Sequence, residues 1–191
     1  MAKLESNFRN MVLVLSGITM FAALALASVY TFTKGPIAMA KIAKQQNAIK
    51  NVLPPYDHID AEPVVKTEGL ESTKTYRAYN KNNEFIGSAV ETITVRGYNG
   101  RVGVIIGFDK TGKIIDYFVL EQNETPGLGA KMVTWFKTDK GKQNIKGVDP
   151  GVTPMTVKDV DAITAATISS KAFLGAVQNA YNAYSANIPE K

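Results

Sequence analysis

The chain has 191 residues, no cysteine, one histidine and a formal net charge of +5. This length fits one domain with an appendage, since domains usually hold about 100–200 residues. The lack of cysteine excludes disulfides, thiolate nucleophiles, iron–sulfur ligation and zinc–thiolate sites. We expect the single histidine, His58, at the surface. Without a cluster of histidine or cysteine ligands, any redox chemistry here needs a bound organic cofactor.

The excess positive charge is confined to the first 50 residues. They hold six basic residues and one acid, whereas residues 51–191 hold 16 of each sign. Basic residues beside an apolar segment are typical of a chain that meets a membrane. The remaining part is neutral, so we do not expect nucleic-acid binding.

The apolar segment itself is the stretch Asn10–Thr33, 24 residues without a charge. About 20 apolar residues suffice to cross a bilayer as a helix. We therefore predict an N-terminal tail at 1–9 and a transmembrane helix at 10–33. A cleaved signal peptide is the alternative, because the start is basic and Ala25-Leu26-Ala27 resembles a cleavage site. The apolar stretch continues beyond that tripeptide, which favours an uncleaved anchor.

The orientation of this span is weakly indicated by charge. Lys34, Lys41 and Lys44 follow it closely, against two basic residues before it. The positive-inside rule then places the C-terminal part in the cytoplasm.

Residues 34–54 are typical of a juxtamembrane stalk helix. Gly35-Pro36 would begin it, because proline is favoured in a first helical turn, and Pro54-Pro55 would end it. A domain at 55–191 follows, with a polar, loop-rich entry over residues 55–73.

From Lys74 the apolar pattern changes to the period of strands. The predicted strands are Thr75–Tyr79, Glu84–Val95, Arg101–Phe108 and Lys113–Leu120. The last two form a hairpin, because Asp109-Lys110-Thr111-Gly112 has the residues of a tight turn. Residues 131–137 are predicted to be helical, and residues 138–151 form a loop. Lys137 and the loop's lysines 140, 142 and 146 either dock a partner or form a solvated face.

The last predicted helix has the clearest pattern. Its apolar side chains recur on one face, which we expect to pack on a core: Phe173, Ala176, Val177, Ala180, Tyr181 and Tyr184. These elements predict an α+β fold with a curved, mainly antiparallel sheet and helices at one side.

The segment Asp161-Ala162-Ile163-Thr164-Ala165-Ala166-Thr167 leads into that helix. A helix start offers free backbone N–H groups and a dipole that favours an anion. A phosphate on Thr167 Oγ would be well placed there. A plain Ser/Thr N-cap explains the segment equally well, so both interpretations stay open at this point.

A second segment, Glu124-Thr125-Pro126-Gly127-Leu128-Gly129, follows the predicted hairpin. Its glycines allow positive φ and close approach of the backbone to a ligand. The alternative is an ordinary strand-to-helix turn.

Together the two segments resemble the FMN-binding domain family. Glu-Thr-Pro-Gly-Leu-Gly followed by Asp-x-x-Thr-x-Ala-Thr is similar to the domain found in the subunit named G of the Rnf ion-translocating oxidoreductase. The subunit named C of the sodium-translocating NADH:quinone reductase shares that domain. The stretch Gly97-Tyr98-Asn99-Gly100 resembles the family's entry to the hairpin, and the anchor and stalk agree in order. One departure is Ala165, where the family commonly has glycine; its methyl group could hinder flavin attachment.

The resemblance implies an electron-relay subunit with no catalytic residue or metal of its own. FMN would be attached through its phosphate to Thr167 by a flavin transferase that uses FAD. Its partners would be the other membrane and iron–sulfur or flavin subunits of a complex that couples electron flow between ferredoxin and NAD to sodium or proton movement. The family also implies a single-pass protein of the bacterial inner membrane with its domain on the extracytoplasmic side. We follow the family here against the charge pattern.

The resemblance also implies roles for particular residues. Asp161 would serve the transferase, and Lys131 would pair with the phosphate. Thr164, Ala165 and Ala166 would keep the approach to Thr167 narrow. Ser169 and Ser170 would donate to the phosphate. The residues expected to line the flavin ring are Glu124, Thr125, Gly127, Leu128 and Gly129.

Two other functions remain open from the sequence. One is a membrane-anchored, non-redox module that binds a small ligand at the Pro-Gly-Leu-Gly loop. The other is a stand-alone FMN-domain protein that serves extracellular electron transfer.

Overall fold

The computed structural model describes residues 7–61 and 70–187; for residues 70–72 it describes the backbone only. The chain divides into two compact units, Met1–Lys44 and Gln45–Lys191. Most of the predicted tail at 1–9, and part of the loop-rich entry at 55–73, lie outside the described residues.

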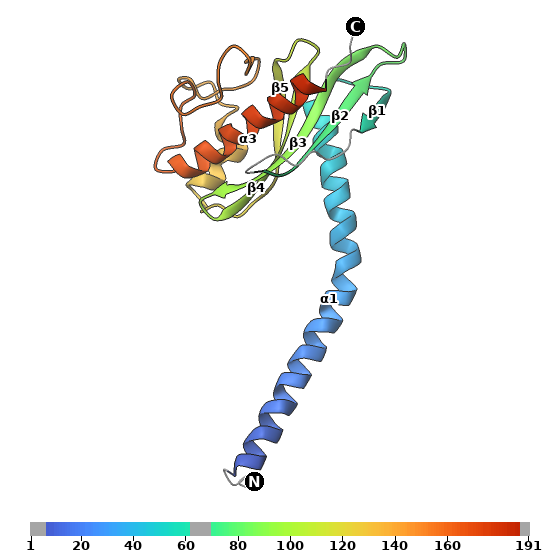
Figure 1. The fold of residues 1–191 in the computed structure, drawn as a ribbon, viewed down its shortest axis with the longest axis vertical. Helices are drawn as coiled ribbons and strands as arrows, with labels where there is room; N and C mark the ends of the chain where they lie inside the picture. The colour runs from blue at the N-terminus through green and yellow to red at the C-terminus, as the bar shows by residue number, and fades with distance from the viewer. Residues whose placement is uncertain (1–6, 62–69, 188–191) are drawn as a thin grey trace. The chain divides into compact units, whose positions relative to one another are not determined.

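The first element is one long helix, α1, at Phe8–Val52 (Figure 1). Within the described residues it is the one helix long and apolar enough to cross a membrane, judged by length and composition. Pro36 lies inside it, so the prediction of a new helix beginning at Gly35-Pro36 was wrong. Proline removes one backbone hydrogen bond, but the residues after it, rich in Ala, Lys, Gln and Met, are good helix formers and continue the helix.

A five-stranded sheet forms the centre of the second unit, with neighbouring strands antiparallel and ordered as in the chain. The strands are β1 (His58–Ala61), β2 (Leu70–Tyr79), β3 (Phe85–Gly97), β4 (Gly100–Asp109) and β5 (Ile114–Gln122). The predicted hairpin is β4–β5, and Asp109 Oδ1 accepts hydrogen bonds from the N–H groups of Thr111 and Lys113 at 2.7 and 3.1 Å.

The strand β1 was missed, because residues 55–73 were expected to be loop. It is four residues long, mostly exposed, and pairs only with β2 among the described strands. A short exposed edge strand has no apolar alternation to reveal it.

Both faces of the sheet are covered, which corrects the expectation of helices at one side. Val104 and Ile106 on β4 join the main core, whereas Ile105 between them packs with Ile49 and Val52 from the end of α1. Successive side chains of a strand point to opposite faces, so β4 contributes to two cores. A Cβ at Gly107 would overlap Val52 O, so this glycine permits the close approach of the helix.

The helix α3, Thr167–Ala186, lies across the sheet with the predicted apolar face inward (Figure 1). Phe173 stacks on Phe136 with ring centroids 4.5 Å apart, and Tyr184 OH donates to Asp109 O at 2.9 Å. Tyr181 is only partly buried. The helical segment predicted at 131–137 lies two residues earlier, as η1 (Gly129–Lys131) and α2 (Met132–Trp135).

Candidate functional site

A pocket of about 590 Å³ joins the two sequence motifs. Three segments meet there: the turn between β3 and β4, the loop after β5, and the start of α3. Antiparallel pairing of β3, β4 and β5 brings the first two segments to the same end of the strands. The lining residues are Tyr98, Glu124, Thr125, Leu128, Gly129, Ala165, Ala166, Thr167, Ile168 and Ser169.

Glu124 is the buried carboxylate of this pocket, with 4% of its surface exposed. Its Oε2 accepts a hydrogen bond from Ser169 Oγ at 2.5 Å, and its Oε1 accepts one from Asn99 N at 3.3 Å. A hydrogen bond to an ionised acceptor is short and strong. These bonds tie the loop after β5 to α3 and to the turn between β3 and β4, and they fix the carboxylate in one place.

Gly129 makes room for this contact. A Cβ there would overlap Ser169 Oγ and lie 2.7 Å from Glu124 Oε2. Gly127 has a different requirement, because its φ is +78° and no atom lies within 4 Å of a Cβ placed on it. Its need is conformational, since side chains disfavour positive φ. The two glycines of the loop therefore serve clearance and backbone conformation separately.

Thr167 is exposed and is the first residue of α3, with Ala166 in the N-cap position. Among the described residues no side chain caps this helix. Ser170 N donates to Ala166 O at 3.0 Å, so the N–H groups of residues 167–169 have no intrahelical partner. The alternative of a plain Ser/Thr N-cap does not hold, since an alanine occupies that position.

Ala165 adopts φ = +59°, one of two non-glycine residues with positive φ in the described chain. For an L-residue the left-handed region costs about 1–2 kcal/mol. This is the position where the resemblance implies a glycine. The turn before Thr167 therefore keeps a glycine-like backbone although its residue is alanine.

Several expected site residues lie outside the pocket lining. These are Gly127, Lys131, Asp161, Thr164 and Ser170. Lys131 and Thr164 are exposed. Ser170 Oγ donates to Ala166 O and accepts from Ile163 N, both at 2.9 Å, so it shapes the turn from within.

Asp161 holds the segment 161–167 against neighbouring loops. Its Oδ2 accepts from Lys142 N at 2.7 Å, and its backbone oxygen accepts from Trp135 Nε1 at 2.9 Å. A Cβ at Gly141 would overlap Asp161 Oδ2. The described contacts of Asp161 are thus structural.

Two lining residues were missed from the sequence, Tyr98 and Ile168, which are 66% and 54% exposed. Large apolar side chains left exposed beside a pocket are typical of a binding surface. The signal for Tyr98 was an aromatic residue in the turn Gly97–Gly100. Ile168 carried no signal, because an apolar residue in a first helical turn is ordinary.

The lysine-bearing loop is partly neutralised. Lys137 Nζ and Lys146 Nζ lie 2.7 and 3.2 Å from the two carboxylate oxygens of Asp116. Burial alone would raise the pKa of Asp116, but hydrogen bonds from Lys137, Tyr117 N and Lys146 lower it on balance. Two of the four lysines therefore stabilise the domain.

The fold and this pocket define an FMN-binding domain, and residues 97–182 match the family described by that name. The match contains the turn with Tyr98, both motifs and most of α3. It thus covers every element that lines the pocket.

Relatives extend the likeness over almost the whole chain. The subunit named G in the Na(+)-translocating ferredoxin:NAD(+) oxidoreductase complex of Acetobacterium woodii is 32% identical, over 90% of this chain and 89% of the relative. Its counterpart in the ion-translocating oxidoreductase complex of Photorhabdus laumondii is 32% identical over 91% and 90%. The counterpart in the proton-translocating ferredoxin:NAD(+) oxidoreductase complex of Clostridium ljungdahlii is 32% identical over 85% and 84%. The chain belongs to this family, the subunits named G of the ion-translocating (Rnf) oxidoreductase complexes.

Proposed function

We propose that this subunit relays electrons within an ion-translocating ferredoxin:NAD oxidoreductase complex, with FMN joined through its phosphate to Thr167 Oγ. The observation that carries the proposal is the shared pocket. It brings an exposed threonine at an uncapped helix start together with the Glu124–Gly129 loop. When bound, FMN supplies the redox chemistry that this chain's side chains lack.

The described residues fit such a group in size and charge. Small-molecule sites usually have volumes of about 300–1,000 Å³, and this pocket has about 590 Å³. The N–H groups of residues 167–169 and the positive end of the α3 dipole favour a phosphate on Thr167. Tyr98, Leu128 and Ile168 offer apolar surface to a flat ring system.

The individual roles follow from the contacts. Ser169 Oγ donates to Glu124, so we assign phosphate binding to the backbone N–H of Ser169. Glu124, held by Ser169, would place a fixed carboxylate beside a flavin ring bound in the pocket. Ser170 and Asp161 position the turn, and Asp161 remains our candidate for recognition by the flavin transferase. Lys131, which is exposed outside the lining, would attract the phosphate only through its charge.

A covalent attachment suits a relay, because the cofactor cannot dissociate in either redox state. The other membrane and iron–sulfur or flavin subunits would then supply donor and acceptor. We further propose that α1 spans the bacterial inner membrane once, over about residues 10–33, with 55–191 on the extracytoplasmic side. Its length and composition support the span.

The attachment is tested by mass. Protein produced with a flavin transferase should carry one FMN, and peptide mapping should place it on Thr167. Thr167→Val should lose it entirely. Thr164→Val is the matched control, because Thr164 is also exposed and lies three residues earlier in the same segment; it should keep the flavin. Flavin retained after denaturation in Thr167→Val would refute the assignment.

The same experiment distinguishes the electron relay from a non-redox binding module. Such a module would release any ligand on denaturation, whereas the relay stays yellow. Family membership over 90% of the chain speaks for a member of a complex and against a stand-alone protein.

A further inference from the structure

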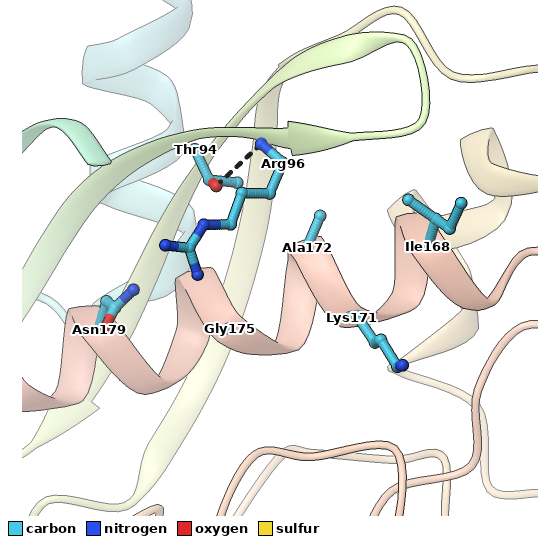
Figure 2. A pocket seen from close by; sticks show the side chains of 7 residues that line it. All are labelled: Thr94, Arg96, Ile168, Lys171, Ala172, Gly175 and Asn179. Carbon is cyan, nitrogen blue, oxygen red and sulfur yellow. Dashed lines mark hydrogen bonds between the residues drawn. The ribbon is translucent and has the colours of Figure 1, made fainter. Parts of the chain in front are cut away.

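A second pocket of about 330 Å³ lies between the end of β3 and α3 (Figure 2). It shares one residue, Ile168, with the larger pocket. Arg96 and Lys171 are its two charged lining residues. The second pocket is therefore a basic neighbour of the candidate flavin site.

Arg96 is directed into this pocket by the local backbone. The β3–β4 register shifts between Thr94 and Gly97, and Arg96 N donates to Thr94 Oγ1 at 3.2 Å. Figure 2 shows the Arg96 side chain running from β3 to α3, with its guanidinium over the turn at Gly175. Lys171 extends away from Arg96 on the helix.

Arg96 and Lys171 have no acidic partner in the part of the chain that the structure describes. Lys171 is the single charged residue of α3, which contains no Asp or Glu. Within residues 7–61 and 70–187, neither Arg96 nor Lys171 forms an ion pair. Lys137 and Lys146, by contrast, share Asp116. Positive charge at this pocket is thus available to a ligand.

The floor of the pocket is open because Gly175 has no side chain. A Cβ there would find no atom within 4 Å. Glycine inside a helix costs about 0.5–1 kcal/mol relative to alanine. No steric conflict with the described residues requires it, so the space it leaves is suited to an incoming group.

We propose that this pocket docks an acidic side chain of the subunit that exchanges electrons with this one. The inference rests on the proposed relay function. A guanidinium presents a planar fork that matches a carboxylate. Electrostatic complementarity speeds and orients association, and redox encounters use small interfaces.

The surroundings favour a protein partner over a free anion. Ile168, which lines this pocket, is 54% exposed, and Tyr98, which lines the larger one, is 66% exposed. They add apolar surface next to the basic pocket, as the core of a protein interface needs. Since Ile168 borders both pockets, a partner anchored here would lie next to the flavin site.

A zero-length carbodiimide cross-link tests the docking without relying on FMN. The reagent joins a lysine amine to a carboxylate in contact with it, with loss of water. In the intact complex, Lys171 should link to an Asp or Glu of another subunit. Lys110 is the control: it lies in the β4–β5 turn, about 30 Å along β4 from the pocket end of the sheet. Links at other subunit contacts but none at Lys171 would overturn the proposal.

Variants in the complex provide the functional arm. Arg96→Glu should slow electron exchange with the flavin about tenfold at low salt, because it reverses a docking charge. Gly175→Leu should do the same by filling the pocket. Lys110→Glu should leave the rate unchanged, and all three should keep FMN on Thr167.

Wild-type rates in both Arg96→Glu and Gly175→Leu would refute the docking role. A second outcome would also refute it. If inorganic phosphate protects Lys171 from reaction while the wild-type complex keeps its full rate of electron exchange, the pocket holds a free anion and not a partner's side chain. An FMN-free wild type with a Lys171 cross-link would refute the relay and support the docking.

Discussion

At the residue scale, Ala165 shows how the structure refines the sequence comparison. From the sequence, the methyl group of Ala165 was noted as a slight hindrance to the flavin transferase. In the structure Ala165 is exposed and has φ = +59°. Its cost therefore lies in the backbone, which adopts a conformation that favours glycine.

Ala165→Gly should consequently stabilise the domain by about 0.5–1 kcal/mol, because relief of the left-handed strain exceeds the added entropy of the unfolded chain. Urea unfolding of the two proteins measures the difference. Ala176→Gly is the control, since Ala176 is buried inside α3 and its replacement should destabilise. A loss of stability in Ala165→Gly would contradict the strain.

Glu124 should set the reduction potential of the flavin rather than its attachment. A fixed anion beside the ring disfavours the electron-rich reduced states. Glu124→Gln should retain FMN on Thr167 and raise the potential in a redox titration. Glu121→Gln is the control, because Glu121 pairs with Arg101 outside the pocket lining. Equal potentials in all three proteins would show that Glu124 does not act on the ring.

Only the site residues that belong to the two sequence motifs could be predicted from the sequence. Glu124, Gly129 and Thr167 belong to two segments whose resemblance to a family placed them at one site, and the structure places them at one pocket. Tyr98 and Ile168 escaped notice, because their position depends on the sheet register and on how α3 packs. Local sequence encodes neither of these.

At the element scale, the outcome followed the strength of the local pattern. The β4–β5 hairpin and α3 were predicted because turn residues and apolar periodicity agree there. The prediction of a helix break at Pro36 was wrong, since one proline is outweighed by the good helix formers that follow it. The second face of the sheet was missed because contact between α1 and β4 is long-range.

Two aspartates of these elements should make the domain acid-sensitive. Burial raises the pKa of Asp109, but hydrogen bonds from Thr111, Lys113 and Gly112 outweigh it and lower the value. The pKa of Asp116 is lowered in the same net sense by Lys137 and Lys146. A carboxyl with a lowered folded pKa stabilises the fold above its unfolded value of about 3.9.

This stabilisation is lost as pH falls from about 4 through the lower folded pKa values. Unfolding free energy measured against pH should therefore drop more steeply for the wild type than for Asp116→Asn, which lacks one of these groups. Parallel curves would mean that the bonds to Asp116 add no stability.

At the scale of the whole molecule, the chain comprises an apolar helical unit and a flavin-domain unit. Charge beyond the span favours a cytoplasmic domain, whereas our proposal places the domain on the opposite side. Lys34, Lys41 and Lys44 lie close to the span and act on its orientation, but Lys3 and Arg9 on the other side oppose them, so the charge difference is too small to decide. Direct labelling has to decide.

The absence of cysteine makes that measurement simple, because no native thiol has to be removed. Asn82 lies exposed in the turn between β2 and β3, and Asn7 lies exposed before the span. With the domain outside, Asn82→Cys should react with a membrane-impermeant maleimide in intact spheroplasts, whereas Asn7→Cys should react only after lysis. The reverse pattern would place the domain in the cytoplasm. Labelling of neither residue after lysis would instead mean that the thiols are covered by other subunits, and the span would then be mapped on the isolated chain in proteoliposomes.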